Sequence, residues 1–567
     1  MDLCLERPPS GGVSEGGMIE QHHASVFEGI ADAIPDAPAL AQGDRITTWG
    51  EMESRASRLS GAMLDAGLGI QARVAIDLRN CSEWMESFFG TLKGRQVPVS
   101  INYRYLDDEL AFLLENSDSE ALIFHASLGE RVVRVAERIA GMKMLIQVDD
   151  IGGAPVPEGV LDYETLVSGH PSAERIERFA DDIVMWYSGG TTGLPKGILI
   201  PIGRSAEMSG SQEGRLRTLG RFGDSLDSIP EDIAECAKVL WSERSRPVAV
   251  PAAPLMHSTA ISYAGPAIFY CGGMVVTLGG KRFDAHELLR VIEEHRVSTI
   301  AIVGDAFAVP ILRAFEERVA KGMPCDASSI KTVYSAGAVW SGGVKEQLFQ
   351  HIPEALLVDN CGSSEGAWYG SSILRRGDSA SSASFLPSPG VLVLGEDGLP
   401  MPPGTGQPGL LASLTMTKGY HKDSVKTAEN FRFIGGEWYT TPGDLGILNE
   451  DGSLTLVGRG TSVINTGGEK VYPEEVDNVI KTMPEVDDCL AFGIPDDQYG
   501  QMVSAVVQLR SGTNLSTASV TEWVRARLAR YKAPRRVHFV DLVPRLPNGK
   551  PDYPGARRLL ENSTPQA

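Results

Sequence analysis

The sequence has little positive charge and few cysteines. Its 52 lysines and arginines face 73 aspartates and glutamates, which gives a net charge of −21 at pH 7. A chain this acidic is poorly suited to nucleic acid, so its composition argues against nucleic acid as the main partner. The seven cysteines are scattered without a CxxC pair. This pattern is typical of a reducing compartment, so we expect a cytoplasmic protein without structural zinc.

The sequence also lacks a clear targeting or membrane segment. Residues 1–24 are rich in Gly, Pro and Ser and have no apolar core, so we expect a disordered lead-in rather than a signal peptide. Residues 247–280 carry no Asp, Glu, Lys or Arg, but prolines and glycines interrupt them. We therefore interpret 247–280 as a buried strand–helix–strand unit and expect no transmembrane segment.

The 567 residues exceed the size of one hydrophobic core and predict more than one domain. Strand-like and helix-like segments alternate up to residue 150 and again from 298 to 358, which is typical of parallel sheets covered on both faces. Short strands with Gly and Pro turns dominate 390–456. The pattern predicts an α/β fold: a large N-terminal domain of layered parallel sheets with a small β-rich subdomain over 25–459, and a small mobile C-terminal α/β domain over 460–567.

The most informative stretch is the loop YSGGTTGLPKG at residues 187–197, which lies between two apolar strand-like segments. Glycines let consecutive backbone N–H groups converge on an anion. The loop adds hydroxyl donors and one positive charge, from Ser188, Thr191, Thr192 and Lys196. The spacing differs from the Walker pattern, because Lys196 is followed by Gly rather than Ser or Thr. The loop predicts a polyphosphate site, with a flexible surface loop as the weaker alternative.

Two further polar segments follow predicted strands: SAGA at 335–338, after a strand at 331–334, and DNCGSSE at 359–365, after a strand ending at residue 358. Loops at the carboxyl ends of parallel strands bind ligands in open α/β sheets. Glu365 offers a hard oxygen to Mg²⁺, Ser364 a hydroxyl to phosphate, and Asn360 an amide that donates and accepts. On the residues alone, a tight turn at 335–338 and a solvated loop at 359–365 stay open.

The loop at 187–197 resembles the phosphate loop of the adenylate-forming superfamily, which contains acyl-CoA synthetases, adenylation domains of peptide synthetases, and luciferases. Segment 359–365 is similar to its aromatic-Gly-x-Thr-Glu motif, with Cys361 at the aromatic position. WYTTPGD at 438–444 resembles its ribose-binding segment, and Gly-Arg at 458–459 its Gly-Arg pair. The resemblance implies that ATP and AMP contact Ser188, Gly189, Gly190, Thr191, Thr192, Lys196, Ser335, Ala336, Gly337, Asn360, Cys361, Gly362, Ser363, Ser364, Asp444, Arg459 and Lys550.

Two strings near the C-terminus resemble parts of a mobile domain. NTGGEKVYPEEV at 465–476 is similar to the loop that lines the pantetheine tunnel of acyl-CoA synthetases. It implies coenzyme A contacts from Gly467, Gly468, Glu469 and Lys470. Asn-Gly-Lys at 548–550 matches the lysine of the adenylation step, although a solvated surface lysine is the alternative. The residues of these strings look most like those of actinobacterial-type ligases that act on fatty acids or steroid side chains. The resemblance covers about residues 25–553.

The resemblance implies ATP, Mg²⁺ and coenzyme A as cofactors, and a hydrophobic carboxylic acid that is activated as an acyl-adenylate and passed to coenzyme A. It implies catalytic roles for Lys550, Glu365, Thr191 and His257, with Glu365 as the metal ligand, and an acyl pocket at His257, Ala306, Ala336 and Gly337. For His257 a core histidine is equally compatible. A different acceptor stays open (a carrier protein, an amine, or nitrite in a diazotisation), as do an inert nucleotide-binding relative and a homodimer.

Overall fold

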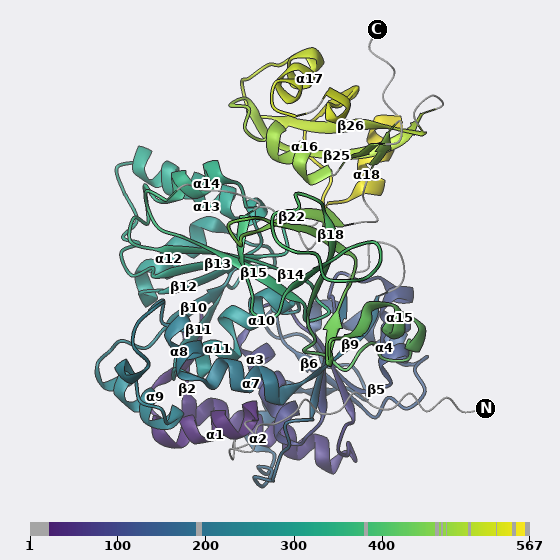
Figure 1. Ribbon diagram of the computed structural model, residues 1–567. Coiled ribbons are helices and arrows are strands. Elements are labelled where there is room, and N and C mark those ends of the chain that lie inside the picture. The colour runs from purple at the N-terminus through teal and green to yellow at the C-terminus, as the bar shows by residue number, and fades with distance from the viewer. Residues whose placement is uncertain are drawn as a thin grey trace, which may run out of the picture.

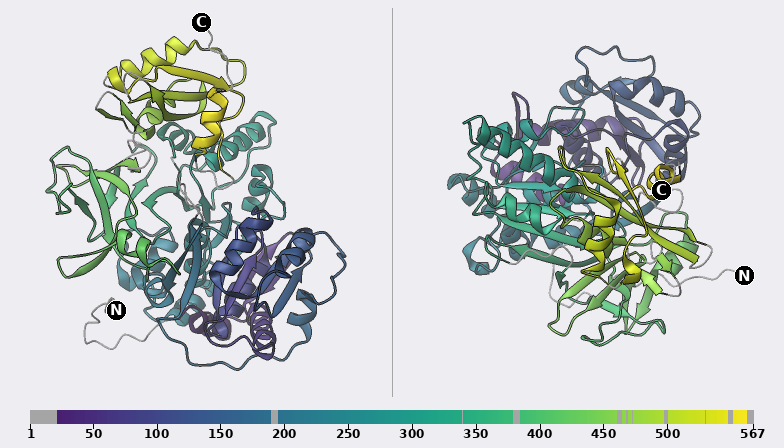
Figure 2. Two further views of the ribbon diagram at one scale, coloured as in Figure 1. Left: turned by 90° about the vertical axis from the view of Figure 1, so that its right-hand side faces the viewer. Right: turned by 90° about the horizontal axis from the view of Figure 1, so that it is seen from above.

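The computed structural model describes residues 22–561 except 189–194, 339, 379–383, 460–463, 467–468, 472, 497–499, 529 and 547–550. Figure 1 shows two helix-covered sheets in the larger part of the molecule and a separate small sheet near the C-terminal end. The left view of Figure 2 also places the small domain at one end of the molecule. This is the α/β architecture that the alternating pattern predicts.

The largest sheet has a parallel middle. Its parallel strands lie in the order β14 (Leu356–Gly362), β13 (Thr332–Ala336), β12 (Thr299–Ile302), β10 (Val248–Pro251), β11 (Met274–Thr277) and β1 (Pro38–Gln42). β2 (Arg45–Thr48) closes one edge antiparallel to β1. Residues 247–280 form β10 and β11 with two short helices between them, so this uncharged stretch is buried strand and helix, as expected.

Beyond β14 the same sheet turns antiparallel and becomes the expected β-rich region. The strands follow in the order β15 (Trp368–Leu374), β16 (Ser384–Pro387), β22 (Leu454–Arg459), β21 (Asp444–Leu448), β18 (Gly409–Leu414), β20 (Glu437–Thr440) and β19 (Phe431–Ile434), with β17 (Leu392–Leu394) beside β18. The largest sheet is therefore mixed rather than purely parallel, because hairpins replace helical crossovers after β14.

The second sheet has the order β7 (Leu161–Asp162), β6 (Met144–Val148), β5 (Ser119–His125), β3 (Arg73–Asp77), β4 (Val97–Ser100), β8 (Ile183–Ser188) and β9 (Lys196–Pro201). All neighbours pair in parallel except β8 and β9, which form an antiparallel hairpin. The Gly-rich loop at 187–197 connects these two strands, so the expected strand–loop–strand unit is present.

Helices cover the faces of both large sheets (Figure 1). They are α1 (His23–Ala33), α2 (Trp49–Asp65), α3 (Ser82–Lys93), α4 (Asp107–Ser117), α5 (Gly129–Ala136), α6 (Tyr163–Gly169), α7 (Ile202–Gly210), α8 (Gln212–Thr218), α9 (Ile233–Ser242), α10 (Ser258–Ala264), α11 (Pro266–Phe269), α12 (Ala285–His295), α13 (Asp305–Ala320), α14 (Gly342–Leu348) and α15 (Ser424–Asn430). α1 begins at His23 and buries Ala24, so the core starts within the last residues of the expected lead-in; residues 1–21 lie outside the described part.

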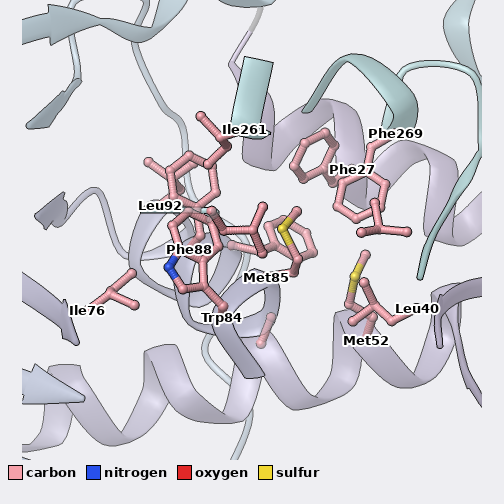
Figure 3. Packing of buried hydrophobic residues seen from close by; sticks show 14 of the residues in the cluster. Phe27, Leu40, Met52, Ile76, Trp84, Met85, Phe88, Leu92, Ile261 and Phe269 are labelled. Carbon is pink, nitrogen blue, oxygen red and sulfur yellow. The ribbon is translucent and has the colours of Figure 1, made fainter. Parts of the chain in front are cut away.

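The main core forms around α3, which is buried along its whole length. Trp84, Phe88 and Leu92 recur at helical spacing and pack with Ile261 of α10 (Figure 3). Phe88 also stacks on Trp186 of β8, with ring centroids 6.2 Å apart. Trp186 lies two residues before Ser188, so this core fixes the strand that enters the Gly-rich loop.

The small domain packs α16 (Pro473–Ile480), α17 (Thr517–Arg525) and α18 (Tyr553–Glu561) on the strands β24 (Glu469–Val471), β23 (Ile464–Thr466), β26 (Gly500–Leu509), β25 (Val486–Asp496) and β27 (Arg536–Val540). Ion pairs join it to the large domain: Arg313 of α13 lies 2.6 Å from Asp487. Lys481 lies 3.0 Å from Asp488 of the small domain and 3.8 Å from Asp305 of α13. Charge pairs therefore hold the observed orientation of the two domains.

Within the described ranges, every helix is too short or too polar to cross a bilayer. The predicted domain boundary at 459/460 stays a prediction, since residues 460–463 lie outside these ranges.

Candidate active site

The β8–β9 hairpin presents the Gly-rich loop. Ser188 and Lys196 are the last residues paired across the hairpin, so they mark the two ends of the loop. Its tip, with Gly189, Gly190, Thr191 and Thr192, lies outside the described residues. The Lys196 ammonium lies 2.6 Å from the Asp423 carboxylate and holds the pKa of that carboxyl below its usual range. The positive charge expected at the loop is therefore present and is neutralised by one acidic partner.

A segment of the β-rich region pairs along β9 and brings a tyrosine to this site. Backbone hydrogen bonds join His421 to Gly197 at 2.7 Å and Lys418 to Leu199 at 2.8 Å. Between these bonds lies Tyr420, whose hydroxyl donates to Glu365 Oε1 at 3.1 Å. Pairing of strands thus links the predicted phosphate loop to the predicted metal ligand.

Glu365 has the surroundings of a ligand-binding carboxylate. Its side chain is buried, and Oε2 has no hydrogen-bond partner among the described residues. A buried charged oxygen without a partner is costly, and a cation would satisfy it. The described part of the chain contains no cluster of three or more acidic, His or Cys side chains with the geometry of a metal cage. A single carboxylate suits Mg²⁺, which proteins often hold through one or two carboxylates together with substrate phosphates.

The two predicted strand-end segments lie side by side. Ala336 of β13 pairs with Asn360 of β14. Ser335 is buried, and its hydroxyl accepts a hydrogen bond from the Gly304 backbone at 3.0 Å. The Asn360 Oδ1 accepts from the Ser371 hydroxyl at 2.7 Å, whereas its Nδ2 is buried without a hydrogen-bond partner in the described structure. An unused amide donor at the carboxyl end of parallel strands fits the adenine role that the sequence predicts.

Segment 359–365 differs from the expected loop because β14 continues to Gly362. The hairpin with β15 supplies backbone partners for these residues, so only Ser363, Ser364 and Glu365 remain in the turn. The Ser363 hydroxyl is buried and has no hydrogen-bond partner among described residues. Cys361 packs in an apolar cluster with Tyr369, and burial raises the pKa of its thiol. The side chain at the family's aromatic position therefore belongs to the core of the β-rich region.

The ribose candidate Asp444 is the first residue of β21 rather than a free turn residue. It is buried, and its Oδ2 accepts a hydrogen bond from the Tyr369 hydroxyl at 3.0 Å. Asp444 pairs across the sheet with Arg459, the last residue of β22, whose side chain is outside the described structure. Both predicted residues thus lie at one end of the β21–β22 hairpin.

Three of the residues predicted for the acyl pocket, Ala306, Ala336 and Gly337, have a small side chain or none. Gly337 has φ +88°, and a Cβ placed there would find nothing nearer than Thr259 and Val303, both at 3.9 Å. Ala336 ends β13 beside it, whereas Ala306 is exposed in the first turn of α13. A Cβ at Gly337 would thus make ordinary contact with Thr259 and Val303, while Ala306 lies at the surface.

His257 caps the N-terminus of α10, and the loop before it is held by Asn80. The Asn80 amide donates to the carbonyls of Pro251 at 2.7 Å and Ala253 at 2.9 Å and accepts from the backbone of Leu255 at 2.7 Å. This three-way clamp fixes the backbone that leads to His257. A single Asn after a strand gave too little signal to be recognised in the sequence.

The predicted residues of the small domain are only partly described. Gly467, Gly468 and Lys550 lie outside the described residues. Glu469 and Lys470 belong to β24, without described side chains. Their assigned roles, like those of Thr191 and Thr192, stay predictions.

Besides Asn80, three site residues were missed in the sequence: Tyr420, Asp423 and Tyr369. Each contacts a predicted residue, namely Glu365, Lys196 and Asp444 respectively. Tyr420 and Asp423 are more than fifty residues away from their partners and reach them only because segment 418–421 pairs with β9. Spacing along the chain carries no signal for such contacts.

Comparison with known proteins shows which family the whole chain resembles. The AMP-binding enzyme family matches residues 27–421, and the AMP-binding enzyme C-terminal domain matches 475–550. A medium/long-chain-fatty-acid–CoA/3-oxocholest-4-en-26-oate–CoA ligase of Mycobacterium tuberculosis is 35% identical over 544 residues, 95% of this chain and 96% of the relative. A 3-oxocholest-4-en-26-oate–CoA ligase of Rhodococcus rhodochrous is 35% identical over 547 residues, 94% of this chain and 95% of the relative.

A solved structure has the same fold. The anthranilate CoA ligase AuaEII, crystallised with anthranoyl-AMP, superposes with a TM-score of 0.80 at 21% identity, covering 96% of this chain and 98% of that one. The family matches and the relatives confirm the resemblance that the Gly-rich loop and the later motifs indicate. The chain belongs to the AMP-binding enzyme family.

Proposed function

We propose that the protein is an AMP-forming acyl-CoA synthetase that activates a hydrophobic carboxylic acid with ATP and passes the acyl group to coenzyme A. One observation carries the proposal. At the end of β14 and in the turn after it, Asn360 Nδ2, Ser363 Oγ and Glu365 Oε2 are all buried without hydrogen-bond partners among the described residues. Buried polar atoms are normally paired, so three unpaired ones beside the phosphate-loop hairpin point to a polar ligand.

In the first step the acid carboxylate attacks the α-phosphate of ATP, and pyrophosphate leaves. Negative charge on the phosphates opposes this attack. We propose that Lys196 at the loop meets part of this charge, and that Tyr420 orients Glu365 for the metal. Glu365 would hold Mg²⁺, which supplies further neutralisation of the phosphates. We propose that the Lys550 ammonium stabilises the negative charge that develops between the carboxylate and the α-phosphate.

In the second step a thiol attacks the acyl-adenylate carbonyl, and AMP leaves. Tyr369 holds the Asp444 carboxylate, which would keep the ribose of the adenylate in place through both steps. The thiol must reach the acyl-adenylate from the side that Lys550 occupies in the first step. We therefore propose that the small domain rotates between the two steps and removes Lys550 from the site. The charge pairs Lys481–Asp305 and Arg313–Asp487 would break or change partners in that turn.

We propose an acid that is larger than acetate. The missing side chain at Gly337 and the small Ala336 favour a hydrophobic tail, and ligand pockets are mostly apolar. The relatives are ligases of fatty acids and of a steroid acid, which agrees with this size. The test compares kcat/KM for acetate, octanoate and 3-oxocholest-4-en-26-oate. A preference for acetate would contradict the proposed pocket.

An acceptor other than coenzyme A is the second candidate, because Cys361 departs from the family's aromatic-Gly-x-Thr-Glu motif. Pyrophosphate release from a panel of acids, measured with and without coenzyme A, separates the candidates. Coenzyme A consumed together with the acid supports a synthetase. Pyrophosphate without thioester points to a carrier protein, an amine or nitrite. The scattered cysteines support a cytoplasmic location, and light scattering decides between monomer and homodimer.

A further inference from the structure

One tyrosine contacts both Lys196 and Glu365, the charged groups predicted for the phosphates and for the metal. The Lys196 ammonium lies over the Tyr420 ring, 5.6 Å from the ring centroid. The hydroxyl of the same ring donates to Glu365 Oε1 at 3.1 Å. A cation is attracted to the face of an aromatic ring, so Tyr420 gives the ammonium a preferred place on the ring that also orients Glu365.

Asp423 holds the same ammonium through an ion pair. Its Oδ2 lies 2.6 Å from Lys196 Nζ, and the two side chains are 32% and 31% exposed. Its Oδ1 accepts a hydrogen bond from the Lys426 backbone at 2.9 Å, which makes Asp423 the N-cap of α15. One carboxylate therefore caps the helix with one oxygen and holds Lys196 with the other.

The backbone that leads to Asp423 is fixed on two sides. Residues 418–421 pair with β9, and Lys422 then turns the chain with φ +55°, a left-handed conformation that lysine rarely adopts. Lys422 Nζ donates to Asp118 Oδ1 at 2.6 Å, and His421 Nε2 lies 3.2 Å from Asp118 Oδ2. Asp118 is the C-cap of α4, which lies near α15 and β9 in Figure 1. The fold thus sets the place of the Asp423 carboxylate.

A carboxylate at this place can affect a nucleotide in two opposite ways. As a negative charge near the phosphates it would repel ATP, so its removal would strengthen binding. As the group that orders Lys196 it would assist ATP, because a lysine side chain without a partner loses rotamer freedom when the nucleotide binds. The ion pair occupies one of the three ammonium donors, which leaves two for phosphate oxygens. The fixed turn and the shared tyrosine favour the ordering role.

We propose that Asp423 is a positioning residue for ATP: it holds the Lys196 ammonium in place, so that the polyphosphate meets a charge that is already ordered. This inference rests on the proposed function, through the phosphate role of Lys196. Asp423 acts through Lys196 and needs no contact with the nucleotide. Its removal therefore weakens the binding of ATP and leaves the binding of the acid unchanged.

Asp423→Asn is the informative variant, because an amide oxygen still accepts the Lys426 backbone hydrogen bond while the ion pair is lost. We expect the Kd for MgATP, measured by calorimetry, and the KM for ATP to rise about three- to tenfold, the order expected for ordering one long side chain. The KM for octanoate should not change. Asp232→Asn is the matched control, since Asp232 caps α9 through the Glu235 backbone at 2.7 Å. It should leave all three constants unchanged.

A double-mutant cycle tests whether Asp423 acts through Lys196. Lys196→Gln alone should weaken MgATP binding at least as much as Asp423→Asn. The double variant should bind MgATP no more weakly than Lys196→Gln, because the charge that Asp423 orders is then absent. A purely structural role of Asp423 would instead add its own loss to that of Lys196→Gln.

Unchanged or tighter MgATP binding by Asp423→Asn would overturn the inference, and so would additive losses in the double variant. If the asparagine variant does not fold, Asp423→Ser keeps a good helix cap without the charge, and the same rise in Kd is expected. Calorimetry needs no turnover. If the unmodified protein binds MgATP but makes no acyl-CoA from any acid, the proposed function fails, and the affinities of the variants still decide the inference. Absence of MgATP binding by the unmodified protein would overturn both.

Discussion

The Tyr420 hydroxyl donates a hydrogen bond to Glu365 Oε1 at 3.1 Å and accepts one from the Asn430 amide at 2.9 Å. This pair joins the β-rich region to the turn after β14, across 55 residues of sequence. It leaves Oε2 as the oxygen of Glu365 without a hydrogen-bond partner in the described structure. The tyrosine therefore orients the carboxylate so that one oxygen is held and the other is free to bind a cation.

Replacing Tyr420 by Phe should weaken adenylation without unfolding the site. The ring packs with Ile198 and Phe431 and is retained in phenylalanine. Loss of a hydrogen bond to a charged group costs about 2 kcal/mol, so we expect a rate of pyrophosphate formation lower by about tenfold or more and a higher KM for Mg²⁺. Tyr531→Phe in the small domain is the matched control. An unchanged Mg²⁺ dependence in Tyr420→Phe would argue against Glu365 as the metal ligand.

Lys345 and Asp359 form a buried ion pair, 2.8 Å apart, directly below the strand ends that carry Ser335 and Asn360. Burial raises the pKa of Asp359 to about 6, although Lys345 opposes the shift. Lys345→Met leaves this carboxyl unpaired, and we expect a loss of about 3–5 kcal/mol in unfolding free energy. The double variant with Asp359→Asn should recover much of that loss. Additive losses in a urea-unfolding double-mutant cycle would show that the two side chains are not coupled.

Asp477 makes the stability of the small domain depend on pH. Burial raises its pKa to about 8, with Lys481 opposing the shift, and its Oδ1 accepts a hydrogen bond from the Ala491 backbone. The folded protein thus holds a proton that the unfolded chain loses near its ordinary pKa. This contribution to stability is complete below pH 4 and decreases as pH rises through about 8, by about 1.4 kcal/mol per pH unit in that window.

Asp477→Asn should remove this dependence, because an amide oxygen can accept the same backbone hydrogen bond without ionising. Unfolding measured between pH 6 and pH 8 should show a flatter profile for the variant than for the unmodified protein. Parallel profiles would mean that Asp477 is ionised in the folded domain.

Lys550→Ala should separate the two half-reactions. We expect adenylation to slow by a hundredfold or more, since loss of one preorganised charge typically costs about 3–4 kcal/mol. Thioester formation from supplied acyl-AMP should be nearly unchanged, because it occurs in the other domain orientation. A solvated surface lysine predicts no change in either half-reaction. Equal losses in both would indicate damage to folding.

Helices and strands could be predicted from the sequence where the local periodicity of apolar residues shows which face of the segment is buried. Trp84, Phe88 and Leu92 recur at helical spacing, and this pattern agrees with α3, which spans Ser82–Lys93. The strand expected to end at 358 continues to Gly362, because its extension is stabilised by pairing with β15. That partner lies beyond a turn whose residues look polar and loop-like in isolation.

The candidate site shows the same difference between short local motifs, which the sequence reveals, and contacts between residues far apart in the chain, which it does not. Glu365, Asn360 and Asp444 were found because each belongs to a short motif. The partners that hold two of them in place, Tyr420 and Tyr369, come from other strands and have no motif of their own. Only the strand order and register bring these tyrosines within hydrogen-bond distance.

The most direct test of the account follows the products when purified protein is incubated with ATP, Mg²⁺, octanoate and coenzyme A. The account predicts equal amounts of AMP, pyrophosphate and octanoyl-CoA, and formation of enzyme-bound octanoyl-AMP when coenzyme A is omitted. ADP in place of AMP, or thioester formed without nucleotide consumption, would contradict it.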